Sequence, residues 1–147
     1  MNTQASKELR RFNHLLGEIN GVYHEVSVKL GLPDSVMMVL YTLCSEGDPC
    51  PLQVIVRQSG ASKQTINSAI RRLEREEIIG LEAAAGRGKN VRLTEKGREL
   101  VRRKVVPIVK IEDEIYASWT WEELREHLER TERFLTALKE KTKGLSM

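Results

Sequence analysis

The chain has 147 residues, of which 31% are charged and only 5% aromatic, and its net charge is +3. The charged N-terminal residues lack the apolar segment of a secretory signal, and no apolar run approaches the ~20 residues of a membrane helix. These features exclude a membrane-spanning chain, and we expect a helix-rich, cytoplasmic protein of one domain or one domain with helical extensions.

An apolar residue at every third or fourth position predicts a long amphipathic helix over residues 6–30. Its apolar stripe consists of Leu9, Phe12, Leu16, Ile19, Tyr23, Val26 and Leu30. Gly31 and Pro33 are placed to end this helix. One helix cannot bury such a stripe alone, so we expect it to pack on its own domain or on a second copy of the chain.

Two shorter helices are expected next, over about residues 35–46 and 51–58. Asp34 or Ser35 is placed to cap the first of them. The residues between the helices, Gly47-Asp48-Pro49-Cys50-Pro51, predict a turn, because two prolines two residues apart exclude a helix through this segment.

The next helix is predicted to start after Ser62, a strong N-cap candidate, and to run to about Glu77. Its apolar side consists of Ile66, Ala69, Ile70 and Leu73. Its polar side carries Lys63, Gln64, Asn67, Ser68, Arg71 and Arg75, with Thr65 and Arg72 at the flanks. The first half of this polar side has no carboxylate, whereas a merely solvated helix usually mixes both signs of charge. This order suits a recognition helix that enters the DNA major groove by its N-terminal end, because carboxylates there would repel phosphates.

Residues 78–93 predict a β-hairpin with strand-like ends and a small, flexible, cationic tip between Ala83 and Asn90. Such a hairpin next to a recognition helix is typical of a wing. Arg87 is then expected to reach the minor groove or the phosphates beside it, and Lys89 and Asn90 the DNA backbone. The alternative is an ordinary hairpin loop with incidental charge.

Two further helices are predicted to complete the chain. Thr94 is placed to cap the first, and Pro107 should kink this helix rather than end it, because the apolar periodicity continues on both sides. Thr120 and Glu123 match a capping box at the start of the last helix, which should run to about Lys141.

Positive charge is concentrated in the middle third of the chain. Residues 57–104 have a net charge of +7, whereas residues 1–56 and residues 105–147 each have −2. This distribution is expected if the middle third meets phosphate and the two ends do something else.

The predicted fold class is mainly α with a small β-hairpin wing, in one domain over residues 1–147. A winged helix-turn-helix lobe that binds DNA is expected over residues 32–98, with helical dimerisation regions over 1–31 and 99–147. The flanking stripes are more than a winged lobe of ~50 residues can cover, so we expect a homodimer. A two-fold dimer presents two recognition helices to half-sites about one turn of DNA, roughly 34 Å, apart.

The chain resembles the MarR family of bacterial transcriptional regulators, through four short segments and through the order of its helices. The segments are Gly31-Leu32, Ser62-Lys63-Gln64-Thr65-Ile66-Asn67, Arg72-Leu73-Glu74 and Leu93-Thr94-Glu95-Lys96-Gly97. The resemblance implies a homodimer that binds palindromic operator DNA, usually as a repressor. It also implies a small phenolic or lipophilic ligand that releases the DNA.

Two departures from the family pattern affect the wing. The family usually carries Asp-x-Arg there, and this chain has Arg87 at the Arg position but Ala85 at the Asp position. The family also tends to have an Arg soon after the recognition helix, and the matching run from Glu77 to Leu81 has none. We therefore expect a looser wing and weaker contacts at its base.

Two sets of site residues follow from the pattern and the resemblance together. The DNA-binding set is Ser62, Lys63, Gln64, Thr65, Asn67, Ser68, Arg71, Arg72, Arg87, Lys89 and Asn90. The ligand-pocket set is Tyr23, Met37, Met38 and Tyr41. Ordinary core packing explains the second set too, and from the sequence alone it is the favoured interpretation.

Nothing in the sequence indicates an enzyme, a cofactor or a metal site. The three histidines, His14, His24 and His127, lie far apart, and there is no phosphate loop, nucleophile elbow or metal-ligand spacing. Cys44 and Cys50 do not form a disulfide framework, and either a buried thiol or a redox-sensing one fits them. The alternative function is a winged-helix module that binds another protein and has lost DNA binding.

Overall fold

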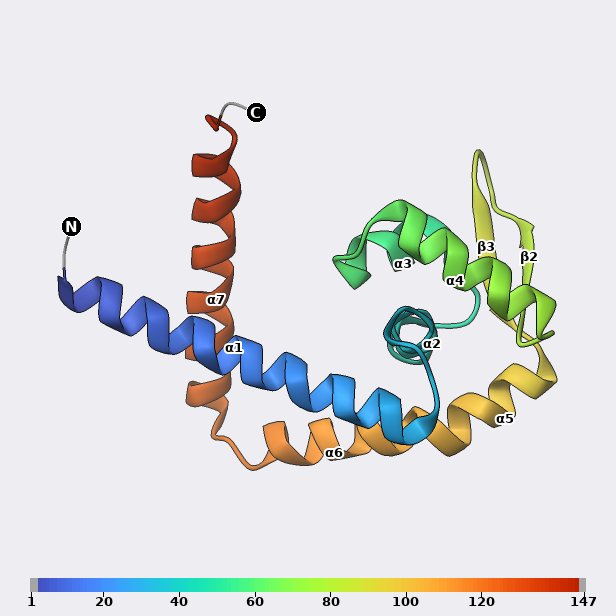
Figure 1. Ribbon diagram of the computed structural model, residues 1–147, viewed down its shortest axis with the longest axis horizontal. Helices are drawn as coiled ribbons and strands as arrows, with labels where there is room; N and C mark the ends of the chain where they lie inside the picture. The colour runs from blue at the N-terminus through green and yellow to red at the C-terminus, as the bar shows by residue number, and fades with distance from the viewer. Residues whose placement is uncertain (1–2, 146–147) are drawn as a thin grey trace. The chain divides into compact units, whose positions relative to one another are not determined.

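The computed structural model describes residues 3–145 of the chain, so the ends of the expected domain, residues 1–2 and 146–147, lie outside the described residues. The chain divides into two compact units, one up to Pro107 and one from Ile108 onwards. In chain order the elements are α1 (Thr3–Leu30), α2 (Asp34–Glu46), β1 (Cys50–Pro51), α3 (Leu52–Ser59), α4 (Lys63–Arg75), β2 (Ile79–Ala83), β3 (Lys89–Leu93), α5 (Glu95–Lys104), α6 (Val106–Ala117) and α7 (Trp121–Thr142) (Figure 1). This is the predicted winged-helix order of helices with a small antiparallel sheet.

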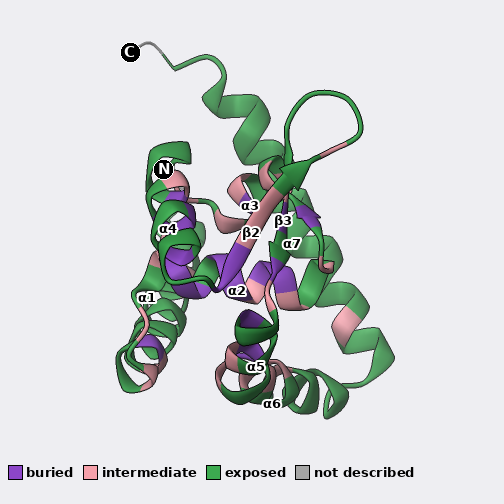
Figure 2. Cartoon of the chain, turned by 90° about the vertical axis from the view of Figure 1, so that its right-hand side faces the viewer, coloured by how far each residue is buried: buried purple, intermediate pink, exposed green. Residues whose placement is uncertain are grey.

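The core of the first unit is built around α2, which packs against α3, α4 and the sheet. Buried residues, purple in Figure 2, gather on these elements. The largest fully buried ones are Leu40, Leu43, Ile55, Ile66, Leu73, Val39, Val91 and Val105. Each contributes about 1.5–3 kcal/mol through removal of its apolar surface from water. The apolar side predicted for α4 is confirmed, since Ile66, Ala69, Ile70 and Leu73 are all buried.

The sheet has three antiparallel strands in the order β1-β3-β2. The β2–β3 hairpin pairs Ile79 with Leu93 and Ala83 with Lys89, which confirms the predicted wing hairpin. The prediction of a plain turn before α3 was incomplete, because Cys50 pairs with Val91 to form the short strand β1. Pro51 is tolerated there because β1 lies at the edge of the sheet.

The start of α2 and the end of α4 differ from the sequence-based expectation. The predicted side-chain cap of α2 is wrong: Pro33 occupies the N-cap position without a capping bond, and Asp34 contacts His24 instead. Helix α4 ends at Arg75 rather than near Glu77, because Glu77 adopts a left-handed backbone conformation with φ +58°.

The helix predicted to continue through Pro107 is divided in two. Helix α5 ends at Lys104 and α6 begins at Val106, so the interruption falls at Val105. Pro107 has no N–H to donate to the carbonyl of Arg103, and its ring crowds that carbonyl. This explains why the chain forms two helices here rather than one kinked helix.

The segment Leu93–Gly97, which carries part of the family resemblance, joins the wing to α4 and the core. The Leu93 N–H donates to Asp48 Oδ1 (2.9 Å), and Thr94 Oγ1 donates to the carbonyl of Glu77 (2.6 Å). Thr94 also caps α5 as predicted, accepting from the Gly97 N–H. A Cβ at Gly97 would overlap the carbonyl oxygen of Ile78, so only glycine fits at this approach. These contacts hold the end of α4 and the base of the wing together.

Helix α1 is tied to α5 at its C-terminal end, where Lys104 Nζ donates to the carbonyl oxygen of Leu30 (2.6 Å). Most of its apolar stripe is exposed, and Ser27 is the one fully buried residue among those described in α1. No single helix in the described part of the chain is long and apolar enough to span a membrane. Helices α1 and α2 meet such a criterion only together, and the chain bends by 96° between them.

The second unit contains most of α6 and all of α7. The predicted capping box is confirmed, since Thr120 Oγ1 accepts from the Glu123 N–H and Glu123 Oε1 accepts from the Thr120 N–H. Trp119 stacks on Tyr116 with ring centroids 5.2 Å apart, and His127 Nε2 lies 3.1 Å from the Tyr116 hydroxyl. Among the residues that the structure describes, neither α6 nor α7 has a buried side chain.

Candidate nucleic-acid interface

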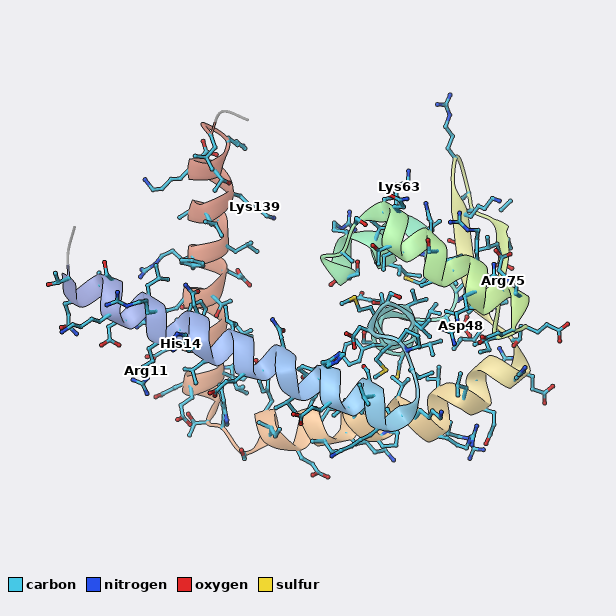
Figure 3. All side chains as sticks on the ribbon, in the orientation of Figure 1. Arg11, His14, Asp48, Lys63, Arg75 and Lys139 are labelled. Atoms are coloured by element: carbon cyan, nitrogen blue, oxygen red, sulfur yellow. The ribbon has the colours of Figure 1, made fainter. Side chains whose placement is uncertain are left out.

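Helix α4 is a firmly anchored platform for polar side chains. Ser62 is its N-cap, as predicted, and its Oγ accepts from the Thr65 N–H (3.1 Å). The buried apolar side fixes the rotation of the helix about its own axis, so the opposite side faces solvent. Lys63 lies at the start of α4 and Arg75 at its far end (Figure 3).

The structure places the predicted α4 residues on one exposed side. The exposed ones are Ser62, Lys63, Gln64, Thr65, Ser68, Arg71 and Arg72, and Asn67 is half-buried. Several already have partners within the chain. Ser62 Oγ donates to Thr65 Oγ1 (2.8 Å), and Arg71 Nη2 donates to Ser68 Oγ (3.3 Å). Arg72 Nε pairs with Glu76 Oε1 at 3.0 Å, which leaves Arg72 less available to a phosphate than Arg71.

The tip of the wing is a glycine-flanked loop between β2 and β3. Gly86 and Gly88 have φ angles of +84° and +112°, conformations that a residue with a Cβ rarely adopts. Arg87 lies between them and is exposed, as is Lys89, whereas Asn90 is half-buried in β3. The three predicted wing residues therefore lie at the tip and along the first part of β3.

An ion pair at the base of the wing was not foreseen from the sequence. Arg92 of β3 binds Glu82 of β2 with two hydrogen bonds, Nε to Oε2 (3.1 Å) and Nη2 to Oε1 (3.0 Å). These bonds lower the pKa of the Glu82 carboxyl below its ordinary value, first through hydrogen bonding and then through the guanidinium charge. The two strands are thus joined by a side-chain tie even though Ala85 replaces the family's usual Asp. The ion pair could have been predicted from the opposite charges of Glu82 and Arg92 if the register of the hairpin had been known.

A cationic groove of about 520 Å³ lies between α3, the start of α4 and the wing. Its lining includes Arg57, Lys63, Arg87 and Lys89, and it contains no carboxylate. Arg57 and Gln53, both on α3, also line it and were missed in the sequence-based assignment. The concentration of positive charge that begins at residue 57 was the available signal for Arg57.

The four predicted pocket residues also come together. Tyr23 of α1 and Met37, Met38 and Tyr41 of α2 line one cavity of about 480 Å³. Met37 is buried in the core, whereas Met38 keeps 38% of its surface exposed. Core packing therefore accounts for Met37 but not for Met38.

A family model for the ArnR1-like winged-helix domain matches residues 22–113, which is well over half of the chain. The chain belongs to the ArnR1-like winged-helix family. The matched range begins within α1, includes the whole lobe with α4 and the wing, and ends within α6.

Solved structures with the same fold as this ArnR1-like protein are MarR family regulators, which confirms the resemblance at the level of fold. One, from Neisseria meningitidis, superposes with a TM-score of 0.75 at 21% identity, covering 92% of this chain and 95% of its own. The Staphylococcus aureus MepR–DNA complex has a TM-score of 0.68 at 20% identity, covering 86% of this chain and 96% of its own. Staphylococcus aureus MarR with salicylate and kanamycin has a TM-score of 0.68 at 15% identity, covering 95% of both chains. No curated protein matches the sequence.

The two thiols of this ArnR1-like protein lie away from the exposed side of α4. Cys50 is buried in β1 and Cys44 is half-buried in α2. Burial raises the pKa of both thiols, and the nearby Glu46 raises that of Cys50 further. A raised pKa keeps a thiol protonated and unreactive, which favours the packing role over redox sensing. Within residues 3–145, no group of three His, Cys, Asp or Glu side chains could hold a metal ion.

Proposed function

We propose that this protein is a transcriptional regulator that binds palindromic operator DNA as a homodimer and acts as a repressor. The observation that carries the proposal is the absence of carboxylates at two adjoining places. The N-terminal half of α4 has none, and neither has the groove that Lys63 of α4 lines together with Arg57, Arg87 and Lys89. Carboxylate-free cationic surfaces of this kind suit the phosphates of nucleic acid.

In the proposed complex, the N-terminal end of α4 enters the major groove. Gln64, Asn67 and Ser68 offer hydrogen bonds to base edges, while Lys63 and Arg71 neutralise phosphates or read guanine. Arg87 at the wing tip reaches the minor groove. The DNA strand between the two grooves passes over the cationic groove, where Arg57 and Lys89 meet its phosphates. Ser62 and Thr65 act chiefly through the cap that orders the first turn.

The homodimer is supported by apolar side chains that the single chain leaves exposed. Leu16, Ile19 and Val22 of α1 keep 43%, 51% and 59% of their surface exposed. Leu128, Leu135 and Leu138 of α7 each keep nearly half. Exposed apolar patches on this scale are typical of protein–protein contacts. A two-fold dimer would bury them and present two α4 helices to adjacent half-sites.

A small ligand that controls DNA binding is the finer part of the proposal. The cavity lined by Tyr23, Met37, Met38 and Tyr41 has the size of an ordinary ligand site. Gln58 and Ser59 at the end of α3 line it too, immediately before the turn that leads into α4. The similarity in fold to Staphylococcus aureus MarR, whose structure is in complex with salicylate and kanamycin, is consistent with such a site.

The test is the salt dependence of binding to promoter DNA selected from the protein's own locus. Wild type should lose affinity steeply as salt rises, because each phosphate contact releases counterions. We expect Arg71→Ala and Lys63→Ala to weaken binding about tenfold and each to reduce the slope of log K against log[salt] by ~0.9. Arg87→Ala should weaken binding less, because a flexible tip holds its Arg less firmly.

Arg11→Ala is the matched control, since it removes the same charge from an exposed position of α1 (Figure 3). It should leave both affinity and slope unchanged. An unchanged slope for Arg71→Ala would show that α4 is not the recognition helix. The absence of any salt-sensitive DNA binding by wild type would favour the alternative, a winged-helix module that binds another protein.

A further inference from the structure

The cavity between α1, α2 and the end of α3 has a distinctive charge. Its lining residues are Asn20, Tyr23, His24, Val26, Ser27, Asp34, Met37, Met38, Tyr41, Thr42, Gln58 and Ser59. Asp34 is the one carboxylate among them, and there is no Lys or Arg. This is the reverse of the cationic groove beside the wing, which holds four Lys and Arg side chains and no acid.

Asp34 has no cationic partner of fixed charge within the lining. His24 Nδ1–H donates to Asp34 Oδ2 at 2.8 Å, and both side chains are about half exposed, at 62% and 50%. The pair lies at the rim, where α1 and α2 meet. Asp34 makes this contact with His24 instead of the expected side-chain cap of α2.

The remaining walls suit an aromatic or alkylated cation. Tyr23 and Tyr41 supply aromatic rings, whose faces attract cations. Met37 and Met38 supply flexible, polarizable thioethers that adapt to irregular shapes. Ser27 and Thr42 are the two buried hydroxyl residues of the lining, and the Thr42 hydroxyl already donates to the Met38 carbonyl (2.8 Å).

We propose that this cavity selects an organic cation, and that Asp34 is the residue that sets this preference. The inference rests on the proposed role of the cavity as an effector site and names the chemical class of the effector. An aromatic acid would place its carboxylate near Asp34 without a Lys or Arg to neutralise it. A lipophilic cation instead pairs with Asp34, replaces the His24 contact, and packs its apolar groups on the Tyr and Met walls.

The cavity also has a direct structural route to the DNA-binding surface. Ser59 Oγ donates to the Val56 carbonyl (2.7 Å) and accepts from the Ala61 N–H (3.1 Å). These bonds shape the turn between α3 and α4, in which Gly60 adopts the left-handed conformation with φ +67°. Ser62, the cap of α4, follows immediately. A ligand that contacts Ser59 therefore also affects the turn from Ser59 to Ser62, which sets the position of α4.

The experiment uses two probes of similar size and shape but opposite charge, tetraphenylphosphonium and tetraphenylborate. Binding of each to the full chain is measured by isothermal titration calorimetry in sodium buffer. We expect tetraphenylphosphonium to bind more tightly, although the protein carries a net charge of +3 that by itself favours the anion. Asp34→Asn should weaken tetraphenylphosphonium binding about fivefold, the scale of a partly exposed charge contact.

Glu25→Gln is the matched control, because it removes the same charge from an exposed residue of α1 that does not line the cavity. It should leave binding of the phosphonium unchanged. Met38→Ala should weaken both probes, which would place them in this cavity. Circular dichroism of each variant confirms that it is folded.

Three results would overturn the proposal: no binding of the cation, tighter binding of the borate, or equal losses for Asp34→Asn and Glu25→Gln. None of these results would contradict the proposed DNA binding, because DNA binding is measured separately, without either probe. Conversely, the protein could bind the cation but no DNA. That result would support the cavity's preference for cations and contradict only its proposed role in controlling DNA binding.

Discussion

The winged lobe and helix α7 use apolar residues in opposite ways. In the lobe, Leu73 and Val91 are fully buried within the chain. In α7, Leu128 keeps 48% of its surface exposed and Leu135 keeps 47%. Both regions have well-formed helices with side-chain caps. The difference shows that the lobe has its own core, whereas the apolar stripe of α7 is exposed, as the proposed homodimer requires.

The largest expected effect is on the free energy of unfolding, and it should differ between the lobe and α7. Leu73→Ala should lower the free energy of unfolding by about 3 kcal/mol, because it opens a cavity at a fully buried position between α4 and the core. Urea unfolding followed by circular dichroism at low protein concentration measures it. Leu128→Ala, which removes the same atoms from α7, should cost well under half as much. Equal losses at the two positions would mean that α7 shares a core of the same kind.

A second change tests what covers α7. Leu128→Glu combined with Leu135→Glu places charge in the exposed stripe, and we expect the homodimer to dissociate while the lobe remains folded. Sedimentation equilibrium gives the oligomeric state, and circular dichroism the helix content. Affinity for a palindromic site should fall toward that for one half-site. As a control, Glu126→Gln and Glu132→Gln alter charge on α7 outside the leucine stripe and should leave the oligomeric state unchanged. A wild-type protein that is monomeric at micromolar concentration would contradict the proposed dimer.

Features that depend on near neighbours in the chain were predictable from the sequence. The caps at Ser62, Thr94 and Thr120 each involve a residue and the N–H three positions later, so the pattern alone reveals them. The same holds for the orientation of α4, because the spacing of its apolar residues decides which side is buried. The most reliable part of the candidate site is therefore the part that lies on one helix.

Features that depend on distant parts of the chain were not predictable. Asp34 looked like a cap, but His24, ten residues earlier, competes for its carboxylate because the chain bends by 96° between α1 and α2. The strand β1 exists only because β3 lies beside it, where Cys50 pairs with the distant Val91. Arg57 of α3 lines the cationic groove only after the wing has folded beside it. In each case the deciding partner is set by tertiary packing and not by local pattern.

The smallest expected effect concerns the first turn of α7, where the capping box replaces missing backbone partners. Thr120→Ala should destabilise this turn by about 1 kcal/mol, because it removes the acceptor for the Glu123 N–H. Hydrogen exchange of that amide measures the loss locally, so a stable lobe does not mask it. We expect the exchange of core amides in α2 to be unchanged, and faster exchange there would contradict a local effect.

The same turn should respond to acid in a defined direction. Hydrogen bonds from the Thr120 backbone and side chain lower the pKa of Glu123 below its ordinary value of 4.5. A lowered pKa stabilises the folded turn fully above about pH 4.5, and this contribution is lost as the pH falls through the lowered value. Glu123→Gln keeps the geometry of a capping box but cannot titrate. Its exchange protection relative to wild type should therefore rise below pH 4.5, whereas equal acid dependence in both proteins would assign the loss to other carboxyl groups.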